Sequence, residues 1–401
     1  MHVRRVHHLP LRVAFVVATC AFVFVFATAG APIPLFNTYR AEDGITKGDL
    51  AMVSVAYFVA AATSLLLLGR LSNHIGRRPV AIAALALAAL SCVVLIGTHG
   101  LFALLAARGL QGLACGLAPG AIGAYVVESA PARPRWLPAL ITGSAPMLGI
   151  PLGALGCGAL VEHAPAPRVL VYVITAAVLT ICTVLVGLSP ETTTARGGAI
   201  ASLRPRLQVP LGSARLLVTA GAAFVATWSL GGFYQAFGAS LAAEYLGTTS
   251  PLVAATVFSS VMILNPVGGP VSARLSPSSA LRFGMAAFVV ALAGILVSLR
   301  LGAFVPLVAA SLLVGCAQGV ASTAGVRGLL STVASEERAG LLATLYLVGY
   351  SGAAVPGMIA GRLAGRLDIF HIFIGYGVLG TAAAIVAMIA ARNTTRKEKT
   401  S

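Results

Sequence analysis

Apolar residues fill the chain in twelve long runs, and polar residues are largely confined to the short stretches between them. A run of about 20 apolar residues is long enough to cross a bilayer as an α-helix. Lipid cannot hydrogen-bond a bare backbone, so helices are expected throughout. The pattern predicts an all-α integral membrane protein whose twelve transmembrane helices lie at about 11–34, 48–68, 79–98, 101–128, 136–161, 168–189, 214–240, 251–272, 279–299, 303–328, 338–361 and 369–391.

Two connections are longer than the others and divide the chain. Residues 35–47 are predicted to form an outer loop. Residues 190–213 are polar, rich in Arg and Gly, and near the middle of the chain, as expected of a linker. We therefore predict an N-terminal six-helix half at 1–190, a cytoplasmic linker at 191–213 and a C-terminal six-helix half at 214–401.

Short motifs recur in the same order in the two predicted halves, a little over two hundred residues apart. Such recurrence indicates an internal repeat, and transporters built from repeats place their substrate path between them. The pairs are Gly69-Arg70-Leu71-Ser72 with Ala273-Arg274-Leu275-Ser276, Gln111-Gly112 with Gln318-Gly319, Pro151-Leu152-Gly153 with Pro356-Gly357-Met358, and Glu128 with Glu336-Glu337.

Composition and charge support a membrane protein and orient it. The chain is 58% hydrophobic and 9% charged, whereas a soluble domain carries about 25% charged residues. The net charge of +16 comes from Arg and Lys gathered in alternate loops and at both ends. Basic loops stay on the cytoplasmic side, so we expect both termini in the cytoplasm. The charge is thus a topology signal with some attraction to lipid, and it does not indicate nucleic acid.

Nothing in the sequence indicates a metal, a cofactor or an enzyme. The six cysteines all lie in apolar runs and form no Cys-x-x-Cys pair, so we interpret them as packing residues. The histidines have no metal-binding spacing, and no nucleotide-binding glycine loop is present. Energy for any transport would then come from an ion gradient.

The stretch Gly69–Pro79, between the second and third runs, carries a family resemblance. It resembles the signature Gly-x-Leu-x-Asp-x-x-Gly-Arg-Arg/Lys of the major facilitator superfamily of secondary transporters. Matching positions are Gly69, Leu71, Gly76, Arg77 and Arg78, while Asn73 replaces the family Asp. The resemblance implies the superfamily fold, transport by alternating access and a gating role for Gly69, Asn73, Gly76, Arg77 and Arg78. In the family that Asp helps to latch the cytoplasmic side.

Arg108 is the charge that lies most clearly within a predicted span. Charged side chains in hydrocarbon are costly and usually face the bundle interior or a wet cavity. The alternative is an arginine that snorkels to the outer surface. Arg108 and Gln111 also resemble the fourth-helix signature of the family, which implies a role in proton handling. Gly112, Gly116 and Gly120 have the spacing of a helix-packing ridge.

Two further features bear on gating and direction. Glu128 ends the fourth run on the side of Arg77 and Arg78, where it either pairs with them or is a solvated helix-end carboxylate. Pro151 and Gly153 lie in a Pro/Gly-rich fifth run that loosely resembles the fifth-helix signature of the family's antiporters. That resemblance implies the branch of twelve-helix drug/proton antiporters and favours efflux.

A substrate pocket would need polar and aromatic groups within the spans. No Asp or Glu lies deep in any predicted span, which argues against a strongly cationic substrate and weakens proton antiport. An apolar pocket with a few hydrogen-bonding groups is typical of small-molecule sites. Each candidate has packing or an interfacial belt as its alternative role. The candidates are Tyr57, Trp228, Tyr234, Gln235, Asn265, Gln318, Tyr346 and Tyr350.

The sequence therefore predicts a transporter, not an enzyme, that moves small organic molecules by alternating access. We expect proton-driven efflux of drug-like or hydrophobic solutes by a monomer in a bacterial cell membrane. The alternatives are uptake or export of one metabolite, such as a sugar or an amino acid, and a membrane receptor or scaffold that has lost transport.

Overall fold

A computed structural model describes residues 9–331, 333–334 and 337–398, so Glu336 of the last repeated motif lies outside the described residues. Twelve segments in this part of the chain are long and apolar enough to span a membrane, which confirms the predicted number. The elements are α1 (Leu11–Gly30), η1 (Ile33–Leu35), α2 (Phe36–Asp43), α3 (Lys47–Leu68), α4 (Ser72–Ile75), α5 (Arg77–Ile96), α6 (Leu101–Ala118), η2 (Pro119–Gly123), α7 (Ala124–Ser129), α8 (Leu137–His163), α9 (Leu170–Leu188), α10 (Ala199–Ser202), α11 (Ala214–Tyr245), α12 (Pro251–Ile263), η3 (Asn265–Val267), α13 (Gly268–Ala273), α14 (Pro277–Arg300), α15 (Phe304–Leu330), α16 (Arg338–Leu363) and α17 (Ile369–Glu398).

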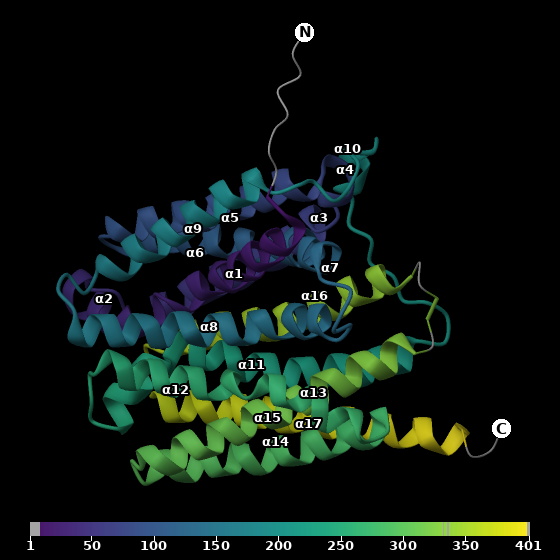
Figure 1. Cartoon of the computed structure of the whole chain (residues 1–401). Helices are drawn as coiled ribbons and strands as arrows, with labels where there is room; N and C mark the ends of the chain where they lie inside the picture. The colour runs from purple at the N-terminus through teal and green to yellow at the C-terminus, as the bar shows by residue number, and fades with distance from the viewer. Residues whose placement is uncertain (1–8, 332, 335–336, 399–401) are drawn as a thin grey trace.

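The first six and the last six spans form two layers of helices (Figure 1). In the first layer α6 packs between α3 and α5, α9 packs on α5, and α1 packs on α8. In the second layer α15 packs between α12 and α14, and α17 packs between α11 and α14. The layers meet along two pairs of helices, α3 with α16 and α8 with α12.

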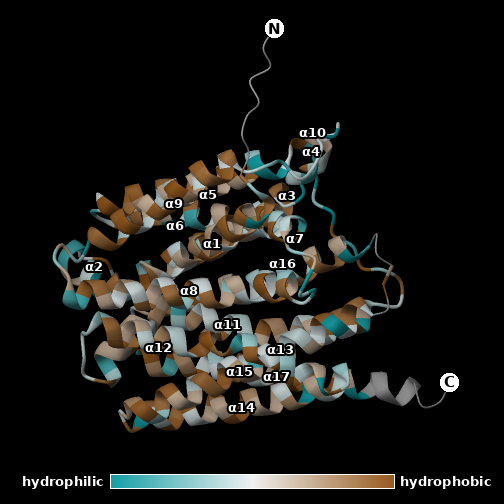
Figure 2. Ribbon diagram, in the orientation of Figure 1, coloured by the Kyte–Doolittle hydropathy of each residue, from teal (hydrophilic) through white to brown (hydrophobic). Residues whose placement is uncertain are grey.

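Large apolar side chains cover the outside of the bundle, and polar residues gather at the two ends of the helices (Figure 2). Val93, Ile181, Val290 and Val378 are each more than half exposed. In water such a surface would aggregate, whereas hydrocarbon solvates it. The hydropathy pattern and the burial pattern therefore agree that lipid surrounds this bundle.

Glycine ridges bring neighbouring helices into backbone contact. A Cβ added at Gly112 or Gly116 of α6 would collide with the backbone of α3, and one at Gly319 of α15 would collide with the Asn265 carbonyl. On α8, a Cβ at Gly153 would collide with the backbone of α1 at Ala27. Small residues permit such close approach in membranes, as expected for the ridge on the fourth span.

Proline and glycine interrupt two of the spans that the pattern presents as single runs. α6 passes through a π-helical turn at Pro119–Gly123 into α7, and α12 breaks at Asn265–Val267 before α13. The prediction that residues 35–47 form a loop is wrong, because the helix α2 occupies most of this stretch. Its residues 36–43 continue the path of the first span as a polar helix, and Gly44, at φ +68°, ends that helix.

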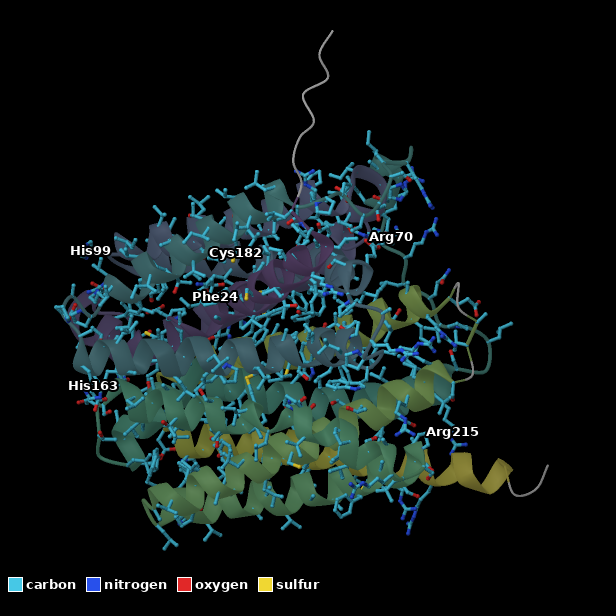
Figure 3. All side chains as sticks on the ribbon, viewed as in Figure 1. Phe24, Arg70, His99, His163, Cys182 and Arg215 are labelled. Carbon is cyan, nitrogen blue, oxygen red and sulfur yellow. The ribbon has the colours of Figure 1, made fainter. Side chains whose placement is uncertain are left out.

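The polar stretch 190–213 lies against the end of the bundle that carries α4. Arg70 donates to the carbonyl of Ser202 at 2.9 Å and to that of Arg204 at 2.6 Å (Figure 3). His74 Nδ1 lies 3.0 Å from the Gly197 carbonyl oxygen. The backbone amide of Gln208 donates a hydrogen bond to Thr344 Oγ1 on α16. This segment thus contacts both layers of helices at one end, which we call the α4 end; the opposite end is the α2 end.

The basic residues at the α4 end predict that this end faces the cytoplasm. A cysteine at the exposed position Arg204, in a background without the six native cysteines, should react in whole cells only with a membrane-permeant maleimide. A cysteine at exposed His99, at the α2 end, is the control and should react with an impermeant reagent. Reaction of the Arg204 cysteine with the impermeant reagent in intact cells would overturn this orientation.

Candidate functional site

Polar contacts between the two layers of helices gather at the α2 end. Lys47 Nζ of α3 lies 2.5 Å from Glu244 Oε1 of α11. The Asn37 side-chain amide donates to the Ala239 carbonyl at 2.8 Å, and Arg40 donates to Ser240 Oγ at 3.2 Å. These contacts join α2 and the start of α3 to α11, so the α2 end is closed.

Two more contacts close the α2 end from either side of this group. The carboxylate of Glu162, at the end of α8, accepts hydrogen bonds from the Ser250 hydroxyl and, at 3.2 Å, from the Leu252 backbone amide of α12. On the other side α3 and α16 approach so closely at Gly48 that an added Cβ would lie 2.7 Å from the Gly361 carbonyl oxygen. Closure here depends on a glycine.

Arg168 stabilises the first layer at the same end. It lies between α8 and α9, donates to Asp43 at 2.7 Å and Glu42 at 2.5 Å, and stacks over the Tyr39 ring at 5.0 Å. Partial burial acts to lower the pKa of Arg168, but its hydrogen bonds to Asp43 and Glu42 outweigh burial and raise that pKa above its ordinary value. Arg168 therefore holds α2 in place as a permanent cation.

A cavity of about 250 Å³ lies between the two layers, beyond the closed α2 end. Residues from both layers line it, and among the described lining residues none is charged. Six of the eight predicted pocket residues are in its wall: Tyr57, Trp228, Gln235, Gln318, Tyr346 and Tyr350. The wall also includes Leu65, Pro119 and Thr142, which lie nearer to the α4 end of their helices.

Aromatic rings form one side of the cavity. Trp228 packs edge-on against Tyr350 with their ring centroids 4.9 Å apart, and Phe224 stacks on Trp228 at 5.6 Å. Tyr346 lies 6.1 Å from Trp228. Gln235, whose carbonyl oxygen is buried and has no hydrogen-bond partner here, and Gln318 supply amide groups to the wall. Such a wall suits a flat, largely apolar molecule with one or two hydrogen-bonding groups.

Tyr234 and Asn265 do not line this cavity. The Tyr234 hydroxyl lies 2.9 Å from Ser311 Oγ, between α11 and α15. Asn265 begins the η3 break, where its backbone carbonyl packs against Gly319. The sequence analysis also missed all the phenylalanines and methionines that line the cavity, because helices apolar on every side give no signal of which face is inward: Phe22, Phe26, Phe58, Met147, Phe258 and Met262.

Arg108 is fully buried, so the prediction of an arginine inside the bundle is confirmed and the snorkelling alternative is wrong. Its Nη1 donates to the Ala29 carbonyl of α1 and to Gln111 Oε1, both at 2.7 Å. The guanidinium lies over the ring of Tyr57, 4.6 Å from its centroid. Tyr57 therefore separates Arg108 from the cavity.

The Gly69–Pro79 stretch forms a network within the first layer and residues 191–193. Arg77 pairs with Glu128 at 2.8 Å and donates to Asn73 Oδ1 at 2.6 Å. Glu128 also accepts from the Thr192 hydroxyl at 2.5 Å. The pairing of Glu128 with Arg77 is thus present, but it lies within one layer. It braces α4 and α5 against α7 and does not join the layers.

Gly76 allows the start of α5 to be capped from a distant segment. Its φ of +104° is a conformation that residues with a side chain rarely adopt, and an added Cβ would lie 2.7 Å from Glu191 Oε2. The Glu191 carboxylate accepts from the backbone amides of Arg77 and Arg78, at 2.8 and 3.0 Å. A carboxylate at a helix N-terminus is favourable. The Arg78 side chain donates to the Gly187 carbonyl at the end of α9.

Twelve spans in two layers around a central cavity, closed at one end, define a membrane transporter. The family model described as the Major Facilitator Superfamily matches residues 17–262, more than half of the chain. The protein therefore belongs to the major facilitator superfamily, as its sequence motifs imply.

The fold is also similar to that of solved structures. The crystal structure of a mutant of the nucleoside transporter NupG superposes with a TM-score of 0.71, covering 94% of this chain and 99% of that chain. The two sequences are 12% identical, so this similarity establishes the fold alone. A comparison with curated proteins found no match.

The close packing of α3 against α16 at Gly48 predicts that a larger residue there would favour the conformation in which the α2 end is open. Gly48→Ala should open the α2 end, raising the ratio of open to closed molecules by about fivefold to hundredfold, because overpacking a backbone contact costs about 1–3 kcal/mol. Spin labels at Ala41 and Thr249, on opposite sides of this end, would report a longer distance. Gly365→Ala is the control, since a Cβ there meets nothing within 4 Å. An unchanged distance in the Gly48 variant would contradict this role.

Proposed function

We propose that the protein exports flat, largely apolar small molecules by alternating access, and that the central cavity is the substrate site. The observation that carries this proposal is the aromatic wall around Trp228, placed between two layers of helices that are joined at one end. In such a fold the substrate site lies where the two repeats meet. The halves 1–190 and 214–401 would rock about this site, with 191–213 as the linker.

The proposed direction follows from the proposed orientation. Arg70, Arg77, Arg78 and Arg204 lie at the α4 end, and this distribution favours a cytoplasmic position for that end and for both termini. A cavity closed at the α2 end is then loaded from the cytoplasm. The membrane in question would be the bacterial cell membrane. The transporting unit would be a monomer.

The proposed energy source is the proton-motive force, with its electrical and chemical parts to be separated by experiment. The absence of acidic residues from the described wall disfavours cationic cargo. The second candidate is uptake of a nucleoside. It is suggested by the name of NupG and supported by the amides of Gln235 and Gln318 beside aromatic rings, since such a pair can hydrogen-bond a base stacked on the rings.

The test measures uptake into inside-out vesicles of 3-phenylpropanamide, 3-phenylpropanoate and uridine. We expect energised uptake of the phenyl compounds and a loss of about tenfold to hundredfold in Trp228→Ala, because removing a buried aromatic contact costs about 1.5–3 kcal/mol. Trp136→Phe is the control, since Trp136 is 61% exposed outside the spans. Nigericin removes the pH gradient and valinomycin the potential, which identifies the driving component.

Three results would redirect the proposal. Energised exit of preloaded uridine, without uptake of the phenyl compounds, would favour the nucleoside candidate, because uptake into a cell is transport out of an inside-out vesicle. Equal uptake by Trp228→Ala and the parent would remove the cavity from the substrate path. Binding of a probe without any energised uptake would favour the receptor alternative.

A further inference from the structure

Arg108 is a buried cation with neutral neighbours as its hydrogen-bond partners. The acceptors of its Nη1 are the Ala29 carbonyl and the Gln111 side-chain oxygen. The acidic residues of the described spans lie at helix ends, and among the described ion pairs none joins them to Arg108: Glu42, Asp43, Asp49, Glu128, Glu162 and Glu244. A buried charge without a counter-charge is strongly destabilising.

Three buried nitrogen atoms at this point have no hydrogen-bond acceptor: Nε and Nη2 of Arg108 and Nε2 of Gln111. All three are donors. Buried polar groups are nearly always paired, so a group of donors without acceptors indicates a missing acceptor. Water would satisfy some of these donors but would leave the positive charge uncompensated. A small anion supplies both the acceptors and the charge.

The donors lie just behind the closed end of the cavity. Phe26 of α1 lines the cavity, and Ala29, whose carbonyl binds Arg108, is one turn further along the same helix. The Tyr57 ring lies against the guanidinium and is itself part of the cavity wall. A molecule in the cavity is therefore separated from Arg108 by a single side chain.

The internal repeat shows that the fold does not require an arginine here. Gln318 occupies the position in the second half that Gln111 occupies in the first, and it lines the cavity directly. Three residues before Gln318 the second half has Gly315, where the first half has Arg108. Gly315 packs close to the Val261 backbone, because a Cβ added at Gly315 would lie 3.0 Å from the Val261 carbonyl oxygen. The guanidinium is thus an addition to one half.

We propose that Arg108 and Gln111 form an anion-binding subsite behind Tyr57, which takes the carboxylate or a similar monovalent anionic group of the transported molecule. The inference rests on the proposed function of the cavity, whose cargo it narrows to apolar ring compounds that carry one negative charge. Tyr57 must turn aside for the anion to reach the guanidinium.

The test uses Trp228 as the reporter. Trp228 and Trp136 are the two tryptophans of the chain, so Trp136→Phe leaves Trp228, in the cavity wall, as the single fluorophore. The purified full-length protein is titrated in gluconate buffer with 3-phenylpropanoate and, separately, with its uncharged amide. We expect the carboxylate to bind at least about tenfold more tightly than the amide, and Arg108→Gln to abolish that preference.

A second variant tests the subsite even if Arg108→Gln fails to fold, because it leaves the buried arginine paired. Gln111→Glu has nearly the same shape and gives Arg108 a built-in counter-ion at the position of its present 2.7 Å contact. It should bind the amide as the parent does and lose the preference for the carboxylate. Arg327→Gln is the matched control, because it removes an exposed guanidinium that donates to Ser272 and should leave the preference intact.

Chloride separates a carboxylate on the cargo from a free anion. If 3-phenylpropanoate is preferred and chloride alone does not raise the unfolding temperature, the cargo supplies the anion. If chloride alone raises it in the parent but not in Gln111→Glu, the subsite binds a free anion. Equal binding of carboxylate and amide, together with no effect of chloride, would overturn the subsite. Failure of both phenyl compounds to change Trp228 fluorescence would instead count against the proposed function of the cavity.

Discussion

Hydrocarbon gives two apolar helices no hydrophobic reason to associate, and this constraint governs how the bundle is held together. What remains is close packing, which requires small residues at the contacts. Gly112 and Gly116 let α6 lie directly on the backbone of α3, and Gly153 does the same for α8 on α1. Between the two layers, large aromatic side chains such as Phe26 and Trp228 line a cavity instead.

Contacts within a layer and contacts between the two layers also differ in how easily they can be broken. Contacts within a layer include glycine-to-backbone packing along whole helices, which has no equally good alternative arrangement. Polar contacts between the layers at the α2 end are between partly exposed side chains such as Lys47 and Glu244. Such pairs are worth about 0–1 kcal/mol each, because water competes for both partners. Apart from the close approach of Gly48 to Gly361, the joint between the layers is thus held by pairs that water can replace, which suits rocking.

The sequence predicted the fold well, because membrane helices are specified by length and hydropathy alone. All twelve spans are present, with ends close to those expected. The breaks at Pro119 and Asn265 have visible causes in proline and glycine, but a long apolar run conceals that its helix is interrupted. The outer stretch 35–47 was mistaken for a loop because its polar composition is shared by surface helices.

The site was harder to predict than the fold. A soluble helix shows its inner face by its apolar stripe, whereas a membrane helix is apolar on all sides, so Phe26 and Phe258 give no sign that they face a cavity. Tyr57, Trp228 and Gln318 were detectable because a polar atom within a span needs a partner. The same reasoning placed Tyr234 in the pocket, although its hydroxyl is satisfied by Ser311 and it does not line the cavity. Which neighbour satisfies a polar atom is a property of the three-dimensional packing.

The charge of Arg108 bears on how transport would be driven. Proton antiport needs a group that gains and loses a proton at physiological pH, and an arginine guanidinium stays protonated in proteins. A singly charged anion that leaves the cell moves with the membrane potential, which is negative inside. Each 100 mV then contributes about 2.3 kcal/mol to export without any titrating residue in the path. A cavity without carboxylates in its described wall and a buried arginine without a counter-ion would then be parts of one arrangement, in which the proposed cargo itself carries the charge on which the gradient acts.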